Sequence, residues 1–258
     1  MNIIECFISV QGEGLRAGRP SLFIRTSGCN LRCVFHNEDG KASSTCDTSY
    51  ASFNPTNEKK YSIDEAVDVF VQHCVEDVVI TGGEPLLDME GLATLIMKLR
   101  EVSPYICVTV ETNGTIVPDD VLLEAVDLWS VSPKLHSSCP TERDCKKFEI
   151  NPSFVNLHEK RRINFDALSK IVDESNDCQL KFVYTGSECL DEIKQLRDEL
   201  QKRVLDSNVN KYIMLMPEGV TRKAILDKSE ECINVCIDEG WTFSSRLQIL
   251  VWGNVKEK

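Results

Sequence analysis

Long apolar stretches and an excess of basic residues are both absent from this chain of 258 residues. No run of about 18 consecutive apolar residues occurs, so a membrane-spanning helix is not expected. The first ten residues lack the basic cluster of a secretory signal, which favours a soluble, cytoplasmic protein. The net charge of -12 argues against nucleic-acid binding, because that affinity depends mainly on Lys and Arg. A small-molecule partner is therefore expected.

Internal repeats and low-complexity tracts are absent as well. At this length, with 42% hydrophobic residues, the chain can bury one large core, and we expect a single domain over residues 1–258. From about residue 60 onward, strand-like apolar runs alternate with helix-like segments, which is the pattern of βα units in a parallel sheet. Six or seven such strands predict an α/β fold of the incomplete TIM-barrel type.

The predicted strands of this pattern are residues 77–81, 106–110, 128–131, 179–184, 212–216 and 247–252. Helices are predicted near residues 62–74, 92–102, 165–174, 190–204 and 221–239. A polar stretch over residues 137–162 interrupts the alternation.

Polar segments follow three of the predicted strands, where barrel enzymes place their chemistry. They are residues 81–85 (TGGEP), 111–114 (ETNG) and 132–134 (SPK). Paired glycines let a backbone approach a ligand closely, and Glu84 offers a carboxylate to an ammonium group. Each segment alone is more typical of a turn with solvated charges. Their joint occurrence with the cysteine-rich loop below favours a functional site.

Three of the twelve cysteines, Cys29, Cys33 and Cys46, lie on one loop after an apolar strand, with His36 among them. In a long chain without an export signal, such thiols are expected to be reduced or bound to metal. Two sites fit this loop. One is a closed zinc tetrahedron that includes His36, typical of a regulatory or interaction protein. The other is a 4Fe-4S cluster held by three thiolates, with one iron left open.

The order of these motifs resembles the radical S-adenosylmethionine superfamily, in which C-x3-C-x2-C precedes a G-G-E-type motif after the second strand. Cys29 and Cys33 match the first two positions, whereas His36 stands at the third. The frequent continuation C-D-T-x-Y appears at residues 46–50. We therefore interpret residues 35–44 as a polar insertion, Cys46 as the third ligand and His36 as a solvated loop residue.

Both ends of the chain resemble 7-carboxy-7-deazaguanine synthases within that superfamily. The matching segments read ECFISVQGEG at residues 5–14 and RLQILVWGN at residues 246–254. The resemblance implies conversion of 6-carboxy-5,6,7,8-tetrahydropterin to 7-carboxy-7-deazaguanine with loss of ammonia, in queuosine-type deazapurine biosynthesis. The alternative within the superfamily is a glycyl-radical activating enzyme, which the terminal segments disfavour.

The resemblance also assigns roles to matching residues. It implies cluster ligation by Cys29, Cys33 and Cys46, and Mg2+ binding by Thr48. It implies S-adenosylmethionine binding by Thr45, Cys46, Asp47, Gly83, Glu84, Ser132, Pro133, Lys134 and Lys181. It implies substrate binding by Val10, Gln11, Gly12, Glu13, Arg25, Thr81, Gln248 and Lys258.

Arg25 would face the substrate carboxylate in a bidentate pairing that Lys could not copy. Gln248 stands where the family usually has His; it can donate a hydrogen bond but cannot titrate near neutral pH. The family also implies an external electron donor of the flavodoxin or ferredoxin type and a homodimer. Cys139 and Cys145, in the polar stretch, could hold a second metal but are expected to be free thiols.

Overall fold

An eight-stranded sheet carries the fold in the computed structural model, which describes residues 1–36, 42–53, 60–73, 75–255 and 257. Its strand order is β1-β2-β5-β6-β7-β8-β9-β10. The strands are β1 (Ile3–Val10), β2 (Pro20–Thr26), β5 (Asp77–Gly82), β6 (Cys107–Thr112), β7 (Leu128–Val131), β8 (Cys178–Tyr184), β9 (Ile213–Pro217) and β10 (Thr242–Phe243). Only β1 runs antiparallel to its neighbour, so the α/β prediction with a mostly parallel sheet is confirmed.

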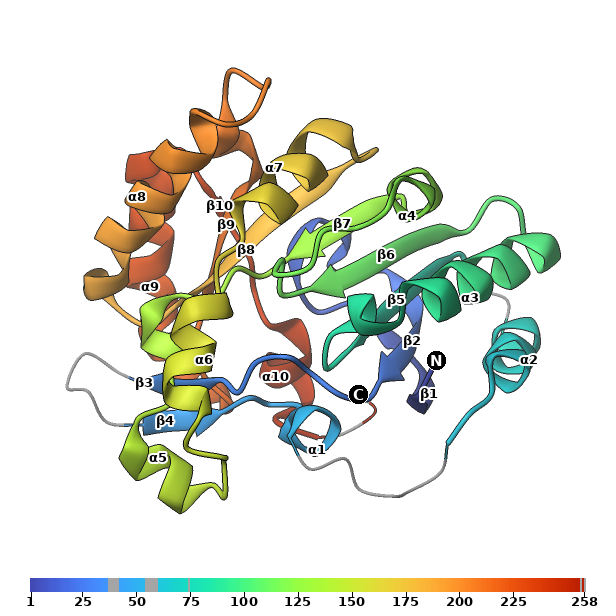
Figure 1. The fold of residues 1–258 in the computed structure, drawn as a ribbon, viewed down its shortest axis with the longest axis horizontal. Coiled ribbons are helices and arrows are strands. Elements are labelled where there is room, and N and C mark those ends of the chain that lie inside the picture. The colour runs from blue at the N-terminus through green and yellow to red at the C-terminus, as the bar shows by residue number, and fades with distance from the viewer. Residues whose placement is uncertain (37–41, 54–59, 74, 256, 258) are drawn as a thin grey trace.

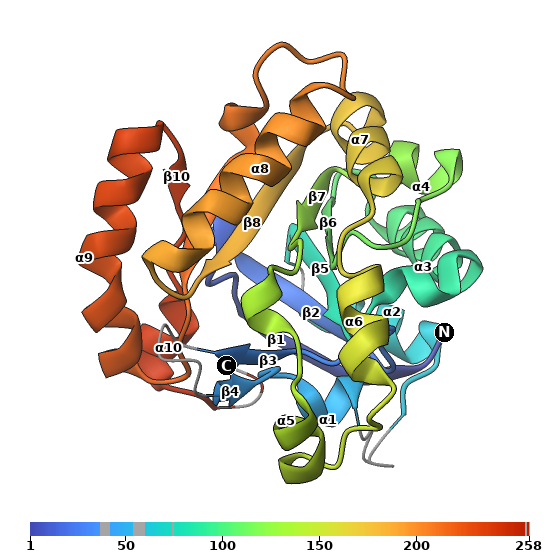
Figure 2. The same cartoon turned by 60° about the vertical axis from the view of Figure 1, so that its left-hand side comes forward.

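Helices cover the outer face of this sheet, as Figures 1 and 2 show. They include α2 (Ile63–His73), α3 (Met89–Val102), α4 (Asp120–Ala125), α7 (Phe165–Glu174), α8 (Leu190–Gln201) and α9 (Arg222–Glu239). In α3, for example, Leu92, Leu95, Ile96 and Leu99 recur at helical spacing and are fully buried. Asp88 begins that helix by accepting a hydrogen bond from the Gly91 amide. In the part of the chain that the structure describes, no helix is both long enough and apolar enough to cross a bilayer.

Several further elements are short. They include the helix α1 (Ser49–Ser52) and the 3-10 helices η1 (Gly14–Arg16), η2 (Pro85–Asp88), η4 (Ser187–Cys189) and η5 (Val209–Tyr212).

The segment predicted as a last strand, residues 247–252, is instead the helix α10 (Leu247–Trp252). A mostly apolar run of six residues has too few turns to show its period, so the sequence could not distinguish a helix from a strand. In the structure, Arg246 bonds to Asp47 Oδ2 at 2.6 Å and to the Gly219 carbonyl at 2.7 Å. These bonds draw the chain away from the sheet edge, and β10 becomes the edge strand.

The polar stretch contains helices that the sequence pattern did not reveal: η3 (His136–Ser138), α5 (Glu142–Lys147) and α6 (Phe154–Arg161). Thr141 and Asp144 form a capping box at the start of α5. Both α5 and α6 lie beside the small ribbon formed by β3 (Val34–His36) and β4 (Ala42–Thr45), in both views.

That ribbon occupies the predicted insertion, of which residues 37–41 lie outside the described residues. The prediction of a solvated His36 is wrong. Its side chain is only 13% exposed, and its ring bonds to Asp144 Oδ2 at 2.9 Å and to the Ser137 carbonyl at 3.2 Å. These contacts attach the ribbon to η3 and α5, which the sequence pattern left without structure.

The turn after β5 packs directly on the turn after β2. The Gly83 amide donates to the Thr26 carbonyl at 3.0 Å, and the Glu84 amide donates to the Gly28 carbonyl at 2.8 Å. A Cβ on Gly83 would lie 1.8 Å from the Gly28 oxygen, so no larger residue fits there. The close approach fixes the backbone immediately before Cys29.

Replacing Gly83 with Ala should lower the free energy of unfolding by about 1–3 kcal/mol, because backbone atoms must move to admit the methyl group. Gly240→Ala is the matched control: it has open space around it and a φ of +69°, so only the left-handed conformation, about 1 kcal/mol, is penalised. Urea unfolding of both variants compares the two losses. A loss at Gly83 no larger than that at Gly240 would show that the close approach does not require glycine.

Candidate active site

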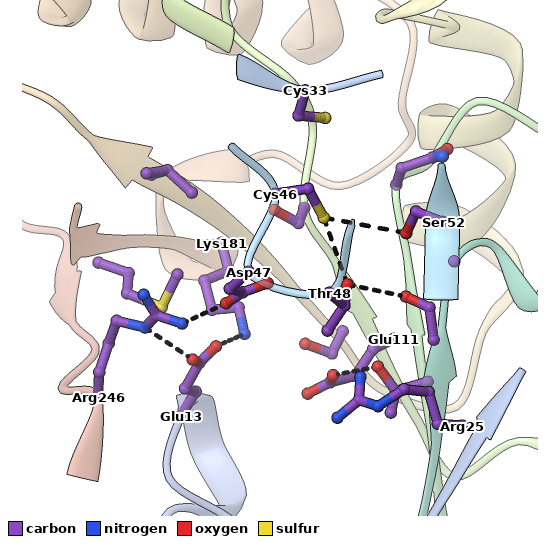
Figure 3. A pocket seen from close by; sticks show the side chains of 18 of the residues that line it. Glu13, Arg25, Cys33, Cys46, Asp47, Thr48, Ser52, Glu111, Lys181 and Arg246 are labelled. Atoms are coloured by element: carbon purple, nitrogen blue, oxygen red, sulfur yellow. Dashed lines mark hydrogen bonds and ion pairs between the residues drawn. The ribbon is translucent and has the colours of Figure 1, made fainter. Parts of the chain in front are cut away.

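A cavity of about 250 Å³ lies at the carboxyl ends of the parallel strands. Its wall includes Thr81 from the end of β5, Thr112 from β6, Ser132 after β7 and Lys181 from β8. The cysteine loop forms another part of the wall, as the close view in Figure 3 shows for Cys33 and Cys46. The three strand-end segments and the cysteine loop therefore meet in one place, as the sequence predicted.

Most of the predicted site residues line this cavity. They are Val10, Gln11, Gly12, Glu13, Arg25, Cys29, Cys33, Thr45, Cys46, Asp47, Thr48, Thr81, Gly83, Ser132, Lys134, Lys181 and Gln248. Glu84 and Pro133 are not part of the lining, and Lys258 lies outside the described residues. The structure places these side chains; their individual roles stay predictions.

Glu84 connects the ends of β5 and β6 by hydrogen bonds. Its carboxylate is buried and accepts from the Thr112 hydroxyl at 2.8 Å, the Asn113 amide at 2.7 Å and the Leu86 amide at 3.1 Å. Burial raises the pKa of this carboxyl. These three donors leave one acceptor position of the carboxylate unused, and its contact with an amino group stays a prediction.

The ribbon pairing brings the cysteines together. Val34 pairs with Thr45, and the Cys46 amide donates to the Cys33 carbonyl at 3.0 Å. Cys29 approaches from the other side of the loop, where its sulfur accepts from the Leu31 amide at 3.4 Å. Two cysteines that are thirteen positions apart in sequence thus lie next to each other at the end of a β-ladder.

The three thiols are hard to ionise without a cation. Burial raises the pKa of Cys29 to about 11, and it raises the pKa values of Cys33 and Cys46 as well. The ammonium of Lys134 opposes this shift at each of the three sulfurs. A bound metal centre would replace the thiol protons, since metal ligation requires the thiolate.

The three sulfurs of the cysteine loop are not gathered closely enough for a single zinc ion. A tetrahedral zinc site with Zn–S bonds of about 2.3 Å holds its sulfurs about 3.8 Å apart. Over the described ranges, the only three metal-ligating side chains whose ligand atoms all lie within 4.8 Å of one another are those of His136, Cys139 and Glu159. The ring of His36, the fourth ligand of the zinc alternative, bonds to α5 and η3 instead. A 4Fe-4S cube, which spreads its thiolates over several irons, suits the donor set of three cysteines.

Glu13 is the centre of the charged network at the other end of the cavity (Figure 3). It pairs with Lys181 at 2.5 Å and with Arg246 at 3.0 Å, and it accepts from Gln248 at 2.8 Å. Burial alone would raise the pKa of Glu13, but these two cations lower it well below its usual range. Arg246 also pairs with Asp47, beside Cys46, so it links this end to the cysteine loop.

A second wall carries Arg25, whose Nε donates to Glu5 at 2.6 Å. Nearby, the Thr81 hydroxyl donates to Glu111 at 2.7 Å, and the Gln11 amide donates to the same carboxylate at 3.2 Å. Across the described residues, the terminal nitrogens of Arg25 have no hydrogen-bond partner and remain available to an anion in the cavity.

Gln248 carries a buried polar atom without a protein partner. Its Nε2 donates to Glu13, whereas its Oε1 has no hydrogen-bond partner within the described part of the chain. A buried acceptor of this kind costs free energy until it is satisfied. Because Gln248 lines the cavity, a bound molecule with an N–H group would satisfy it.

Sequence reasoning did not assign roles to Glu111, Arg246 and Glu218, which also line the cavity. Glu111 stands at a predicted strand end, and Arg246 opens the C-terminal motif, so both had a visible signal. Glu218 had none. Its carboxylate accepts from the Ser44 hydroxyl at 2.8 Å and pairs with Lys228 at 2.8 Å, contacts that depend on the tertiary fold.

The side chain of His158 hydrogen-bonds to the backbone of the cysteine loop. This fully buried ring accepts from the Arg32 amide at 3.2 Å through Nδ1 and bonds to the Ser138 hydroxyl at 3.2 Å through Nε2. The Arg32 guanidinium lies over the rings of Phe53 and Phe154, at 5.4 and 4.5 Å. Burial lowers the pKa of His158 to about 4, so the ring is neutral near pH 7.

Fold and site together define an iron–sulfur protein with one cluster. The family model described as a 4Fe-4S single cluster domain matches residues 10–149. The 7-carboxy-7-deazaguanine synthase of Halobacterium salinarum is 36% identical over 99% of this chain and 91% of its own length. That of Rhodopirellula baltica is 34% identical over 98% and 86%.

The chain belongs to the 7-carboxy-7-deazaguanine synthase family. Its fold is similar to the crystal structure of QueE from Escherichia coli, with a TM-score of 0.59 and 24% identity. That match covers 95% of this chain and 93% of the other.

Cys46→Ala should abolish cluster assembly, because two thiolates remain where three are needed. His36→Ala should keep about four irons per chain. Its free energy of unfolding should fall by about 1–2 kcal/mol, since the bonds to Asp144 and Ser137 are lost. Iron analysis after anaerobic reconstitution, together with urea unfolding, measures both effects. Loss of iron in His36→Ala with retention in Cys46→Ala would reverse the ligand assignment.

The stability of the chain should fall as the pH decreases from about 6.5 to about 4. The pKa of His158 is lower in the folded state than in the unfolded state. Between these pH values the unfolded state therefore binds the proton more readily, and acidification favours unfolding. The contribution reaches about 3 kcal/mol for a shift of this size. His158→Gln, which does not titrate, should show a flatter profile in urea unfolding between these pH values. Parallel profiles would mean that His158 does not remain neutral in the folded protein.

Proposed function

We propose that this chain is a 7-carboxy-7-deazaguanine synthase, a radical S-adenosylmethionine lyase. It would convert 6-carboxy-5,6,7,8-tetrahydropterin to 7-carboxy-7-deazaguanine with release of ammonia, in deazapurine biosynthesis of the queuosine type. The observation that carries this proposal is the shared cavity, with three thiols at one end and the groups around Glu13 and Arg25 at the other. The identity with named synthases over nearly the whole chain supports it.

The sheet supports a partial TIM-type barrel as the core of this enzyme. Seven strands from β2 to β10 run parallel, and β1 and β10 are the two edges of the order. Helices cover the outside, and the site lies at the carboxyl strand ends, where barrel enzymes have it. We further propose that residues 1–258 form one domain and that the protein is cytoplasmic.

Cys29, Cys33 and Cys46 would hold the 4Fe-4S cluster. When bound, the cluster supplies one electron for the reductive cleavage of S-adenosylmethionine, chemistry that belongs to the cofactor. The protein contributes the surrounding surface. Thr45, Asp47, Gly83, Ser132, Lys134 and Lys181, which all line the cavity, would bind and orient S-adenosylmethionine.

The pterin would bind at the far end of the cavity. Arg25 offers its terminal nitrogens to the substrate carboxylate, while the unpaired Gln248 Oε1 would accept from a ring N–H or amino group. Val10, Gln11, Gly12, Glu13 and Thr81 complete this wall.

Mg2+ prefers hard oxygen ligands, and the Thr48 hydroxyl is a suitable one beside the cavity. An external flavodoxin-like or ferredoxin-like protein would donate the electron, and a homodimer is expected from the family.

Arg25→Lys tests the substrate assignment. Losing a forked, charged hydrogen bond to the carboxylate should raise the KM for the pterin by about tenfold to a hundredfold. Uncoupled cleavage of S-adenosylmethionine, followed as methionine release, should continue near the wild-type rate. Arg19→Lys is the control, because Arg19 pairs with Asp77 and Glu76 and does not line the cavity.

The assay uses anaerobically reconstituted protein with the carboxy-tetrahydropterin, Mg2+, S-adenosylmethionine and a reductant. Formation of 7-carboxy-7-deazaguanine is the expected result. Cleavage of S-adenosylmethionine without this product would reject the proposed substrate. An equal loss of both activities in Arg25→Lys would reject the role of Arg25.

A further inference from the structure

A second group of metal-ligating side chains lies outside the cavity, in the polar stretch after β7. A ring nitrogen of His136, the Cys139 sulfur and a Glu159 oxygen all lie within 4.8 Å of one another. None of the three residues lines the cavity. Glu159 Oε2 accepts from Cys139 Sγ at 3.0 Å and bonds to His136 Nδ1 at 2.8 Å. A nitrogen and a sulfur ligand thus converge on one carboxylate oxygen.

The backbone presents two of these ligands on one turn. The 3-10 helix η3 contains His136, and the Cys139 amide donates to the His136 carbonyl at 2.9 Å. Two intervening residues separate the pair, a spacing common for paired zinc ligands. The third ligand, Glu159, comes from α6, so the group joins two elements that are not continuous in sequence.

Arg162 orients the third ligand. Its Nε and Nη2 donate to Glu159 Oε1 at 3.0 and 2.8 Å. The other oxygen, Oε2, is therefore turned toward the thiol and the imidazole. Outer hydrogen bonds of this kind fix metal-ligating carboxylates in known metal sites.

We propose that His136, Cys139 and Glu159 bind one divalent transition-metal ion, with zinc as the expected metal and water in the fourth position. One imidazole nitrogen, one thiolate and one carboxylate are ligands that zinc accepts, and the thiolate disfavours Mg2+ and Ca2+. On binding, the thiol proton leaves to solvent. The imidazole proton moves from Nδ1 to Nε2 of a side chain that is 76% exposed.

The ion would connect η3 to α6, the two elements that contact the cysteine loop and its ribbon. His158, next to Glu159 on α6, holds the Arg32 amide, and the Ser137 carbonyl on η3 holds His36. A metal joining η3 to α6 would restrain both contacts at once. This is a structural site, separate from the proposed cluster and from the cavity.

Equilibrium dialysis against Zn2+ tests the site in the reconstituted holoenzyme. The expected result is one zinc per chain in addition to the cluster iron. Cys139→Ser and His136→Ala should keep their iron and lose the zinc; the His136 side chain is exposed, so its removal should not prevent folding. Cys145→Ser is the matched control, because that buried thiol packs against Val34 and Ile150. Equal zinc in wild type and Cys139→Ser would overturn the proposal.

The absorption spectrum of bound Co2+ is an independent test, measured in the full chain carrying Cys29→Ser, Cys33→Ser and Cys46→Ser. With the loop thiols removed, bound Co2+ should show the intense ligand-field bands of a tetrahedral site and a sulfur-to-cobalt charge-transfer band. Adding Cys139→Ser should remove the charge-transfer band, and its persistence would reject Cys139 as a ligand. This experiment needs neither cluster nor substrate, so its failure is distinct from failure of the proposed function.

Discussion

The antiparallel pairing of β3 with β4 is the interaction on which the cysteine loop depends. It places Val34 opposite Thr45, and the bond from the Cys46 amide to the Cys33 carbonyl continues the ladder by one rung. Without it, the entropy of the intervening chain would oppose bringing the two thiols together. The backbone hydrogen bonds of the ladder offset this loss of entropy. The pairing uses no cysteine side chain, so the sulfurs remain available as ligands.

The ribbon is in turn held by contacts from distant parts of the chain. Ser44 bonds to Glu218 after β9, and His36 bonds to Asp144 on α5. Arg246 spans from Asp47 to Glu13 and so connects the cysteine loop with the far end of the cavity. The relative position of the two ends of the site is therefore set by a buried ion network as well as by the sheet. Removing one partner of such a network leaves an uncompensated charge.

The sequence predicted those features whose signal is local. The strands β5 to β9 were visible as apolar runs, and their polar, glycine-rich ends marked the cavity wall. The helix α10 was mistaken for a strand because a mostly apolar segment of six residues has no clear period. Two of the groups that donate to Glu84, on Thr112 and Asn113, lie at another strand end and could not be predicted, because only the tertiary fold brings them to it. The surroundings of His36 could not be predicted for the same reason.

The ladder beside the thiols also separates the geometry of the site from the length of the loop. The paired positions next to Cys33 and Cys46 set the separation of those two sulfurs, so chain added beyond the ladder need not disturb it. The ladder already contains an irregularity between Phe35 and His36, whereas a residue added beside the pairing of Val34 with Thr45 would turn one of the two sulfurs to the opposite face. The outer rungs of the ribbon therefore accept an irregularity that the rung beside Cys33 and Cys46 would transmit directly to the sulfurs.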